Sequence, residues 1–230
     1  MDIMRVVFCL PGNSFSSNFL IAWTRLIDAC NKKGISIVMA PGVSSHVALA
    51  RSKSFGYNVF GGENQKPFGG ELDYDYIMCI DSDILFTPEH FFDMLESPHD
   101  VTSGLYIMSD NKHFTAVKDW DTSYFGKNGT FEFMTPEYIE KWKSENIDRY
   151  MKVVYSGLGW TLIKKGVLEK LTYPIFWSDV HRIPNVDTSK PDIVDMSSED
   201  VSLFLNLGKV GVVSVIDTKI RVGHEKIVVL

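Results

Sequence analysis

The stretch from residue 74 to residue 96, YDYIMCIDSDILFTPEHFFDMLE, decides the fold. Residues 77–80, IMCI, form a short and continuous apolar run, which is typical of a strand buried on both faces of a parallel sheet. The polar triplet Asp81-Ser82-Asp83 follows that run at once. Next, Thr87 is suited to cap a helix and Pro88 to occupy its first position. The stretch therefore predicts a central strand, a polar strand end and a helix.

The two carboxylates of the triplet stand where an α/β protein binds its ligands, just beyond the carboxyl end of a strand. Asp81 and Asp83 can hold a hard divalent cation through oxygen, and such a cation would bring a phosphate group with it. The alternative is a solvated turn, since a chain with this acidic content produces Asp-x-Asp by chance. The position directly after a buried strand favours the cation site.

Length and composition set the broad class. At 230 residues the chain can bury a full core and is expected to form one domain over residues 1–230. Its net charge of −6 argues against a nucleic-acid backbone as the main partner. Its apolar runs are shorter than the roughly 20 residues of a membrane span, and its N-terminal residues suit a strand better than a signal peptide. Cys9, Cys30 and Cys79 lie far apart inside apolar runs, which favours buried thiols in a reduced compartment and therefore a cytoplasmic protein.

The order of the remaining elements predicts an α/β sheet. A strand over residues 5–10, a helix over residues 15–30 and a strand over residues 35–40 open the chain as β-α-β. Later segments predict a strand over 101–108 interrupted by Gly104, a loop or hairpin over 119–130, a helix starting at 135, a strand over 152–155, a helix ending at 171, and strands over 211–216 and 219–222. We expect a mixed, mostly parallel sheet flanked by helices.

Three further segments carry candidate functional residues. A short helix over residues 44–56 holds Arg51. Residues 172–197 contain three prolines and no sustained period, so we expect a long, mobile loop that acts as a lid. The motif Ser198-Glu199-Asp200 then begins a helix, with the serine as its cap and both carboxylates in its first turn.

Four stretches occur in an order that resembles the GT-A type of nucleotide-sugar-dependent glycosyltransferase. They are the helix with Arg51, the strand end Asp81-Ser82-Asp83, the turn Gly157-Leu158-Gly159-Trp160 with the following TLIKKGVLEKL, and the Ser198-Glu199-Asp200 helix followed by Val222-Gly223-His224. The resemblance runs from residue 5 to residue 226 and extends to the compact glycosyltransferases of large DNA viruses of algae. It implies a Rossmann-like GT-A domain that binds the nucleotide with about residues 1–108 and the acceptor with about residues 109–230. For a viral protein it implies the host cytoplasm.

The resemblance implies a set of residues for the cation. Asp83 would ligate Mn²⁺ or Mg²⁺ directly, Asp81 would contact the cation through water or contact the ribose, and His224 would complete the metal shell. A carboxylate and an imidazole suit Mn²⁺, and the cation would act as a Lewis acid on the departing diphosphate. The alternative for His224 is a surface histidine after a last strand.

Further residues are implied for the nucleotide-sugar. Contacts to it are expected from Pro11, Gly12, Arg51, Ser82, Gly157, Gly159, Trp160 and Lys226. Pro11 and Gly12 would lie along the nucleobase. Arg51 would lie near the base or the diphosphate, although a solvated helix residue fits its position equally well. The glycine turn would lie under the donor sugar and the acceptor, and the tryptophan that ends it is as well suited to the core.

The acceptor side is implied to carry the chemistry of transfer. Asp200 would remove the proton from the acceptor hydroxyl, and the N-terminus of its helix favours the ionised form. The alternative is an ordinary carboxylate of a helix start. Trp177 and Glu199 are expected to face the acceptor, with packing as the alternative for Trp177.

The sequence therefore predicts a metal-dependent glycosyltransferase that moves a sugar from a nucleoside-diphosphate donor, with UDP favoured, to a carbohydrate or glycoconjugate hydroxyl with inversion. Two alternatives remain open. A phosphohydrolase of the haloacid-dehalogenase type also uses Asp-x-Asp with Mg²⁺, but there the motif normally follows the first strand, and it does not continue with a pair such as Ile84-Leu85. A non-catalytic nucleotide-sugar or glycan-binding module of the same fold is the second alternative, and the presence of Asp200 argues against it.

Overall fold

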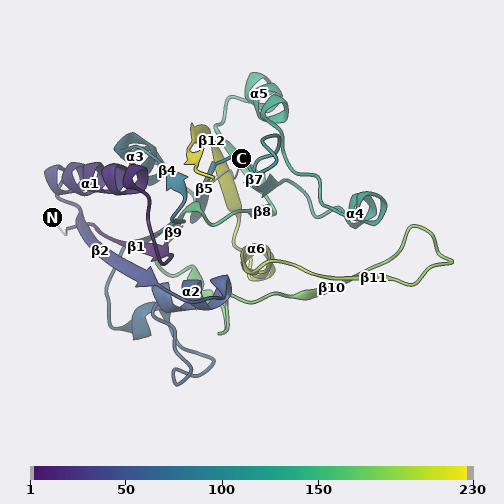
Figure 1. Ribbon diagram of the computed structural model, residues 1–230, viewed down its shortest axis with the longest axis horizontal. Coiled ribbons are helices and arrows are strands. Elements are labelled where there is room, and N and C mark those ends of the chain that lie inside the picture. The colour runs from purple at the N-terminus through teal and green to yellow at the C-terminus, as the bar shows by residue number, and fades with distance from the viewer. Residues whose placement is uncertain (1–2, 227–230) are drawn as a thin grey trace.

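The computed structural model describes residues 3–226, so residues 1–2 and 227–230 of the predicted domain lie outside the described part. Its main sheet has seven strands in the order β2-β1-β3-β9-β5-β12-β7 (Figure 1). The bounds are β1 (Arg5–Pro11), β2 (Ser36–Gly42), β3 (Tyr76–Ile80), β5 (Val101–Leu105), β7 (Tyr150–Val153), β9 (Trp160–Lys164) and β12 (Ser214–Arg221). Strands β2, β1, β3, β5 and β12 run in one direction, whereas β9 and β7 run against their neighbours. The expected mixed, mostly parallel sheet is confirmed.

Helices cover both faces of this sheet (Figure 1). They are α1 (Ser17–Lys32), α2 (Val47–Ser54), α3 (Pro88–Leu95), α4 (Thr122–Asn128), α5 (Pro136–Glu145) and α6 (Glu199–Lys209). One core cluster joins α1 and α3 to the sheet, and a second joins α2 and α6 to its other face. A third, smaller cluster lies beneath α5.

The central strands alternate between these two cores, because successive side chains of a strand point to opposite faces. In β1, Phe8 packs with α1 and α3, while its neighbour Cys9 packs on the other face. In β3, Met78 and Ile80 belong to the first core and Cys79 to the second. The apolar run at residues 77–80 is therefore a strand buried on both sides, as its composition predicts.

Local sequence signals account for most helix starts. Ser16 caps α1 by accepting a hydrogen bond from the backbone N–H of Phe19, and Thr135 caps α5 in the same way. Thr87 caps α3 with Pro88 at the first helical position, as predicted. The strand end at Asp81-Ser82-Asp83 therefore lies between a fixed strand and a fixed helix.

Five predictions of secondary structure are wrong. Residues 160–164 form strand β9 and residues 168–170 a single 3₁₀ turn, where a helix is predicted. Residues 122–128 form helix α4 inside the predicted loop, and residues 172–197 include a two-stranded ribbon, β10 (Val180–Ile183) with β11 (Ile193–Met196). Strand β12 is continuous where two strands are predicted. Strand β5 also passes through Gly104 without interruption. Glycine is required there because the indole of Trp160 fills the space that a side chain would need.

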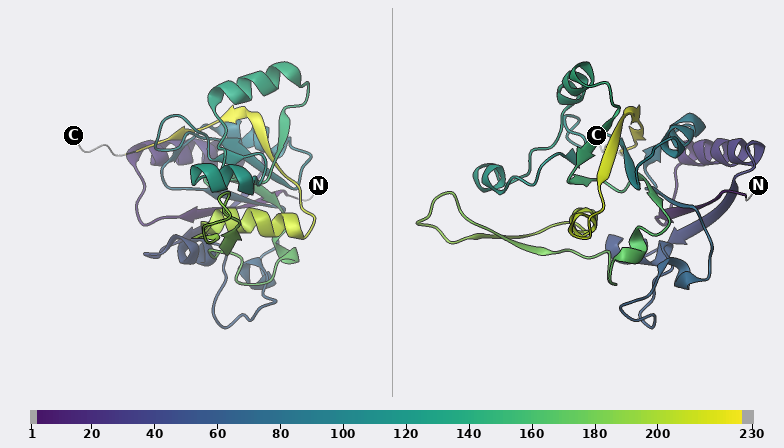
Figure 2. Two further views of the ribbon diagram at one scale, coloured as in Figure 1. Left: turned by 90° about the vertical axis from the view of Figure 1, so that its right-hand side faces the viewer. Right: turned by 180° about the vertical axis from the view of Figure 1, so that it is seen from behind.

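Shorter pairings complete the fold. Strand β4 (Ile84–Leu85) pairs with β13 (Gly223–His224), and β6 (Ala116–Val117) pairs with β8 (Tyr155–Ser156). A further 3₁₀ turn lies at Pro67–Gly70. Figures 1 and 2 show the β10–β11 ribbon reaching away from the sheet with α4 beside it.

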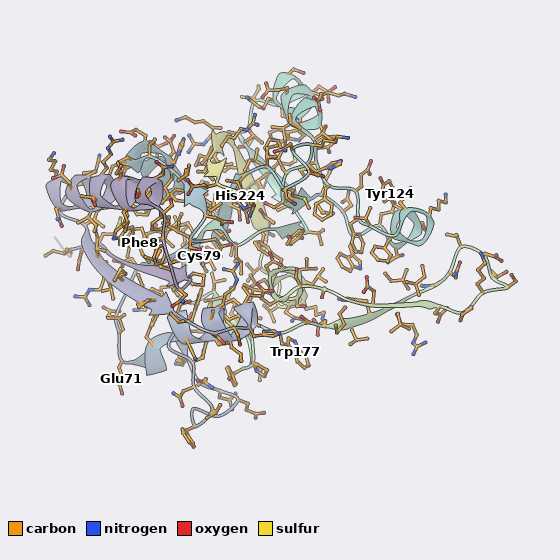
Figure 3. The ribbon with its side chains drawn as sticks, in the orientation of Figure 1. Phe8, Glu71, Cys79, Tyr124, Trp177 and His224 are labelled. Carbon is orange, nitrogen blue, oxygen red and sulfur yellow. The ribbon has the colours of Figure 1, made fainter. Side chains whose placement is uncertain are left out.

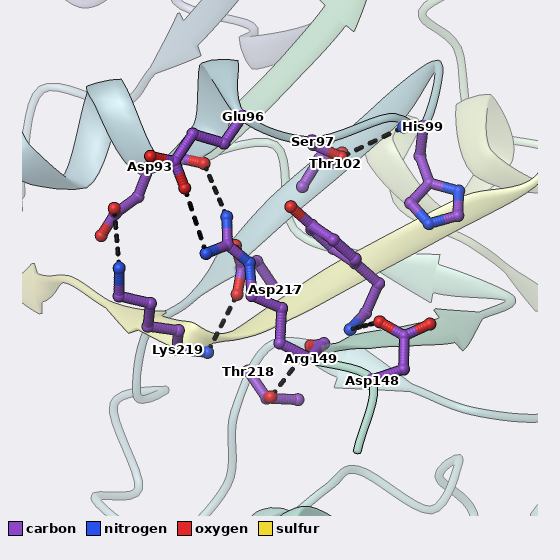
Figure 4. Close-up of polar contacts among 11 residues, drawn as sticks. Asp93, Glu96, Ser97, His99, Thr102, Asp148, Arg149, Asp217, Thr218 and Lys219 are labelled. Atoms are coloured by element: carbon purple, nitrogen blue, oxygen red, sulfur yellow. Dashed lines mark hydrogen bonds and ion pairs between the residues drawn. The ribbon is translucent and has the colours of Figure 1, made fainter. Parts of the chain in front are cut away.

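A polar network ties β12 to the end of α3 (Figure 4). The guanidinium of Arg149 contacts the buried carboxylate of Asp217 at 3.0 Å and also reaches Glu96 at 3.3 Å. Lys219 pairs with Asp93 on the same surface. Burial raises the pKa of Asp217, so its charge depends on Arg149 remaining in place.

Candidate functional site

The strand-end triplet meets the first loop of the chain. Asp81-Ser82-Asp83 lies between β3 and β4, at the carboxyl end of the parallel strands. Gly12 follows β1 at this edge, and its N–H donates to the carbonyl of Gly42 at 3.0 Å. A Cβ atom on Gly12 would lie 2.9 Å from the Cβ of Ser82, and the φ of Gly12 is +154°. This close approach places Gly12, and with it the end of β1, beside the triplet.

Arg51 is a buried residue that joins three elements at this edge. Its Nη1 and Nη2 atoms reach the carboxylate oxygens of Asp81 at 2.9 and 3.1 Å. Its Nε atom donates to Glu199 at 3.0 Å. Burial opposes the charge of Arg51, but the neighbouring carboxylates of Asp81, Asp200 and Glu199 together raise the pKa of the guanidinium. Arg51 is therefore a fixed cation between the end of β3 and the start of α6, and not a solvated helix residue.

Asp83 faces two residues from the far end of the described chain. The Nε2 atom of His224 lies 3.2 Å and the Nζ atom of Lys226 lies 2.6 Å from its Oδ2 atom. The pairing of β13 with β4 holds His224 beside Ile84, and the N–H of Glu225 donates to the carbonyl of Asp83 at 2.7 Å. Burial opposes ionisation of Asp83, but the hydrogen bonds from His224 and Lys226 outweigh it and lower the pKa of the carboxyl to about 2.

The donor set at Asp83 and His224 suits a divalent cation. The Nδ1 atom of His224 lies 2.6 Å from the carbonyl oxygen of Ile107, which fixes the tautomer with the proton on Nδ1. The Nε2 atom is then the nitrogen that faces Asp83, and a cation bound between the two would take the lone pair of Nε2 in place of the proton through which Nε2 bonds the carboxylate. Within residues 3–226 no group of three or more His, Cys, Asp or Glu side chains is arranged for a metal. The chain would thus supply two ligands and leave the remaining positions to phosphate oxygens and water.

Gly157, Gly159 and Tyr106 lie together against the end of β3 and form the floor of the candidate site. The N–H of Gly159 donates to the hydroxyl of Tyr106 at 3.0 Å, and its carbonyl accepts from the N–H of Asp81 at 3.1 Å. A Cβ atom on Gly159 would lie 2.8 Å from that hydroxyl and 3.1 Å from Oδ2 of Asp81, and one on Gly157 would overlap the hydroxyl of Tyr106. The turn therefore requires glycine at both positions to bring its backbone against the strand end.

Asp200 lies half-buried in the first turn of α6. Its Oδ1 atom accepts from the N–H of Val201 at 2.8 Å and from the hydroxyl of Ser198, and its Oδ2 atom lies 3.4 Å from the hydroxyl of Tyr155. Burial and the adjacent charge of Glu199 raise the pKa of Asp200, while Ser198 and the other donors act in the opposite direction. The net direction is opposite to the one expected from the helix N-terminus alone, and it strengthens the carboxylate as a base.

Three predicted ligand contacts are placed differently by the structure. The side chain of Trp160 is fully buried and packs against Phe86 with ring centroids 4.9 Å apart, so its assignment to the nucleotide-sugar is wrong for the indole. Trp177, labelled in Figure 3, is exposed and lines a cavity with Asn206 and Val210 near the C-terminal end of α6, whereas Asp200 lies in the first turn of that helix. Glu199 is buried, and its carboxylate is engaged by Arg51.

The sequence analysis does not predict two residues of this site, Tyr106 and Tyr155. Tyr106 is buried, and burial together with the charges of Asp81 and Asp200 raises the pKa of its hydroxyl. Tyr155 is buried beside Asp200, and burial and that carboxylate raise the pKa of its hydroxyl in the same way. Tyr106 follows the end of β5 and Tyr155 lies just beyond the end of β7. These positions near strand ends are the only local sequence signal that could have indicated a role in the site.

No protein-family model matches the chain, and no curated protein matches it either. Three solved structures resemble it over nearly its whole length. "A197 from STIV" is 18% identical with a TM-score of 0.53, over 98% of this chain and 87% of that one. GalNAc-T7, in a structure with UDP, GalNAc and Mn²⁺, is 12% identical with a TM-score of 0.53, over 96% of this chain and 44% of that one. A Drosophila β-1,4-galactosyltransferase 7 mutant, in complex with manganese, UDP-Gal and xylobiose, is 10% identical with a TM-score of 0.48, over 98% and 72%.

These similarities define the class of fold. The seven-stranded sheet, the polar triplet after β3 and the solved structures together show that the chain has a GT-A-like fold. Within residues 3–226, none of the helices combines the length and the apolar composition that a membrane crossing requires.

Proposed function

We propose that the protein is a metal-dependent glycosyltransferase that moves a sugar from a nucleoside-diphosphate sugar to a hydroxyl of a carbohydrate or glycoconjugate, with inversion at the sugar carbon. One observation carries the proposal: Tyr106 joins the two halves of the site. Its ring packs against His224 with centroids 5.2 Å apart, and its hydroxyl accepts from the N–H of Gly159. Burial is the main cause that raises the pKa of Tyr106, and the charges of Asp81 and Asp200 add to it. A cation-binding pair and a candidate base thus share one floor, which is what transfer from a diphosphate donor requires.

The donor side is assigned to the strand end. Pro11, Gly12 and Ser82 would line the nucleoside, and the glycine turn would support the sugar. Arg51 holds the carboxylate of Asp81 with one hydrogen bond and a second ion-pair contact, so Asp81 is oriented before any ligand arrives. Such preorganisation lowers the cost of ordering the site when the donor binds.

Asp83 and His224 would hold the cation, and Mn²⁺ is favoured because carboxylate and imidazole both suit it. When bound there, a divalent cation would stabilise the negative charge that develops on the leaving diphosphate. Lys226 already contacts Asp83, so we assign to it a contact with the phosphates on the same side. UDP is the favoured carrier because the similar GalNAc-T7 structure contains UDP together with Mn²⁺.

The acceptor side is assigned to the start of α6. Asp200 would take the proton of the attacking hydroxyl, since a half-buried carboxylate with a raised pKa is a better proton acceptor than a solvated one. Tyr155 orients Asp200 through its hydroxyl. The ion pair of Glu199 with Arg51 fixes this turn of α6 against the end of β3, so the base and the donor side are held in one geometry.

The decisive measurement is titration of UDP into the wild type and into Asp83→Ala, each with and without Mn²⁺. We expect Mn²⁺ to tighten UDP binding by the wild type and to leave the affinity of the variant unchanged, with the variant still folded. An equal effect of Mn²⁺ on both proteins would rule out this cation site. A panel of nucleotide sugars, followed by thermal stabilisation in the presence of Mn²⁺, then selects the donor, and detection of the glycosylated product separates an enzyme from a binding module of the same fold.

Two further assignments accompany this function. We propose that residues 1–108 supply most of the nucleotide contacts and residues 109–226 most of the acceptor contacts. We also propose a cytoplasmic location, supported by the burial of Cys9, Cys30 and Cys79 as free thiols. Fractionation of tagged protein from its native host would test that location.

A further inference from the structure

A small aromatic pocket lies beside α6, between helix α4 and the β10–β11 ribbon. Its volume is about 240 Å³. The walls are formed by Trp120, Phe125, Phe131 and Phe133 on one side, and the ribbon contributes His181 and Met196 on the other. The structure described above assigns no role to this pocket.

The walls are held in place by their own packing. Trp120 and Phe131 are stacked with ring centroids 3.9 Å apart, and Phe125 contacts Phe131 at 4.8 Å. A Cβ atom on Gly126 would lie 3.2 Å from the side chain of Val186, so α4 packs directly against the ribbon. The pocket is therefore a built feature of α4 and the ribbon, and not a gap between two unrelated segments.

The pocket lies next to Asp200 of the candidate site. Val201 lines it, and this residue directly follows Asp200. Phe133 packs edge-on against Tyr155 with ring centroids 6.3 Å apart, and the hydroxyl of Tyr155 lies 3.4 Å from the carboxylate of Asp200. An acceptor whose hydroxyl gives its proton to Asp200 and attacks the donor sugar would thus place a neighbouring group in this pocket.

Two polar side chains of the pocket, His181 and Ser197, are paired with each other, and a third, Asp195, is exposed at the edge of the pocket. The Nε2 atom of His181 lies 3.0 Å from the hydroxyl of Ser197, which lies 2.8 Å from that of Ser202. The carboxylate of Asp195 accepts from the N–H of Met196 at 2.8 Å. A sugar ring in the pocket would leave its hydroxyls facing aromatic walls, which is costly unless each finds a partner. An apolar group loses nothing there and gains about 25 cal/mol for each Å² removed from water.

We propose that this pocket binds an apolar group that the acceptor carries next to its reacting hydroxyl. The inference rests on the proposed glycosyl transfer and names its acceptor class, a glycoside or glycolipid with an apolar aglycone, in place of a free saccharide. An aromatic aglycone and an alkyl chain share the required chemistry, and the test distinguishes them.

The test measures binding, so it does not depend on turnover. Phenyl, octyl and methyl β-D-glucopyranosides are titrated into the protein with UDP and Mn²⁺ present, and saturation-transfer NMR reports which protons of the ligand touch the protein. We expect the phenyl or the octyl glucoside to bind at least about tenfold more tightly than the methyl glucoside, given the apolar area that the pocket would bury. Preference for phenyl over octyl indicates an aromatic aglycone, and the reverse indicates an alkyl chain.

Two variants and one control locate the effect. Thr130→Trp adds bulk at the exposed rim, and Met196→Asp places a carboxylate at the exposed edge of the ribbon, so both leave the core untouched. Each should abolish the preference for an apolar aglycone, whereas Trp177→Ala, in the cavity at the other end of α6, should retain it. Equal affinity for all three glucosides, a preference that survives both rim variants, or one that Trp177→Ala also removes would overturn the pocket assignment. Failure of the proposed function has a different signature, which is absence of transfer to any acceptor whatever the binding preference.

Discussion

Replacing Asp200 by asparagine would separate binding from chemistry at the start of α6. Asparagine has the same size, and its Oδ1 atom can still accept from the N–H of Val201 and the hydroxyl of Ser198. Only the long 3.4 Å contact from Tyr155 changes, because an amide nitrogen would then face that hydroxyl. Each such hydrogen bond is worth about 1 kcal/mol, so the free energy of unfolding should change by no more than about that amount.

The chemical cost is expected to be much larger. A positioned base contributes about 10²- to 10⁴-fold to a rate, and at 1.36 kcal/mol per tenfold this is about 2.7 to 5.4 kcal/mol of barrier. The pKa of Asp200 is raised by burial and by the charge of Glu199, which makes its carboxylate a stronger base than a solvated aspartate. For the wild type, kcat/KM should fall as the pH falls through the pKa of Asp200, with a midpoint above that of an ordinary aspartate.

The assay is single-turnover transfer to a fixed acceptor, together with titration of the donor. Asp200→Asn should bind UDP with Mn²⁺ as tightly as the wild type, while its turnover falls by the factor above. Asp192→Asn, which removes the same charge from the exposed ribbon, serves as the matched control and should retain full activity. Near-normal turnover of Asp200→Asn would return this residue to a helix-start role, and a product with retained configuration would refute direct displacement.

Three further predictions concern the floor, the distal network and acid stability. Gly159→Ala should weaken UDP binding by tenfold or more with the fold intact, since the added methyl would press on Asp81 and on the hydroxyl beneath it; calorimetry decides, and unchanged affinity would contradict the close approach. Arg149→Met should lower the free energy of unfolding in urea by about 3 kcal/mol, because it strands the buried charge of Asp217, and adding Asp217→Asn should recover part of the loss. The folded pKa of Asp83, about 2, lies below its unfolded value near 3.9, so its ionised form stabilises the protein above about pH 4 and that contribution is lost as the pH falls toward 2. Acid unfolding of Asp83→Asn should be correspondingly flatter across this range, and an identical curve would contradict the pairing with His224 and Lys226.

The parts of the fold that the sequence predicts are those with a local physical signal. Residues 77–80 form a short apolar run that ends at once in a polar triplet, which favours a strand buried on both faces, and Thr87-Pro88 predicts the start of α3. The prediction of a helix at residues 160–164 is wrong because a short apolar run with mixed residue types fits a helix and a strand equally well. The segment is a strand because it pairs between β3 and β5, which the local sequence does not show. Helix α4 had readable signals, a capping Asp121 and a left-handed Gly129 at its end, but lacked an apolar period.

The candidate site divides in the same way. The triplet and the order of the motifs were enough to anticipate Asp83 near His224, which the structure brings within 3.2 Å. The ion pair of Arg51 with Glu199 joins residues 148 positions apart, and nothing local indicates it. Tyr106 matters because two glycines let a distant backbone approach its hydroxyl, so its role exists only in three dimensions.

The pairing of β13 with β4 has a consequence for the order of events during synthesis. Asp83 and Lys226 are separated by 143 positions, so the cluster of Asp83, His224 and Lys226, for which we propose cation and phosphate binding, is not assembled until nearly all of the described chain has left the ribosome. By then β1, β3, β5, β9 and β12 can already form their parallel and antiparallel contacts, which need none of the residues of β13. A nascent or prematurely ended chain would thus be compact yet unable to hold the metal and the diphosphate together. A chain truncated after Arg221 should unfold cooperatively in urea but show no effect of Mn²⁺ on UDP affinity, and a retained Mn²⁺ effect would mean that His224 does not complete the metal site.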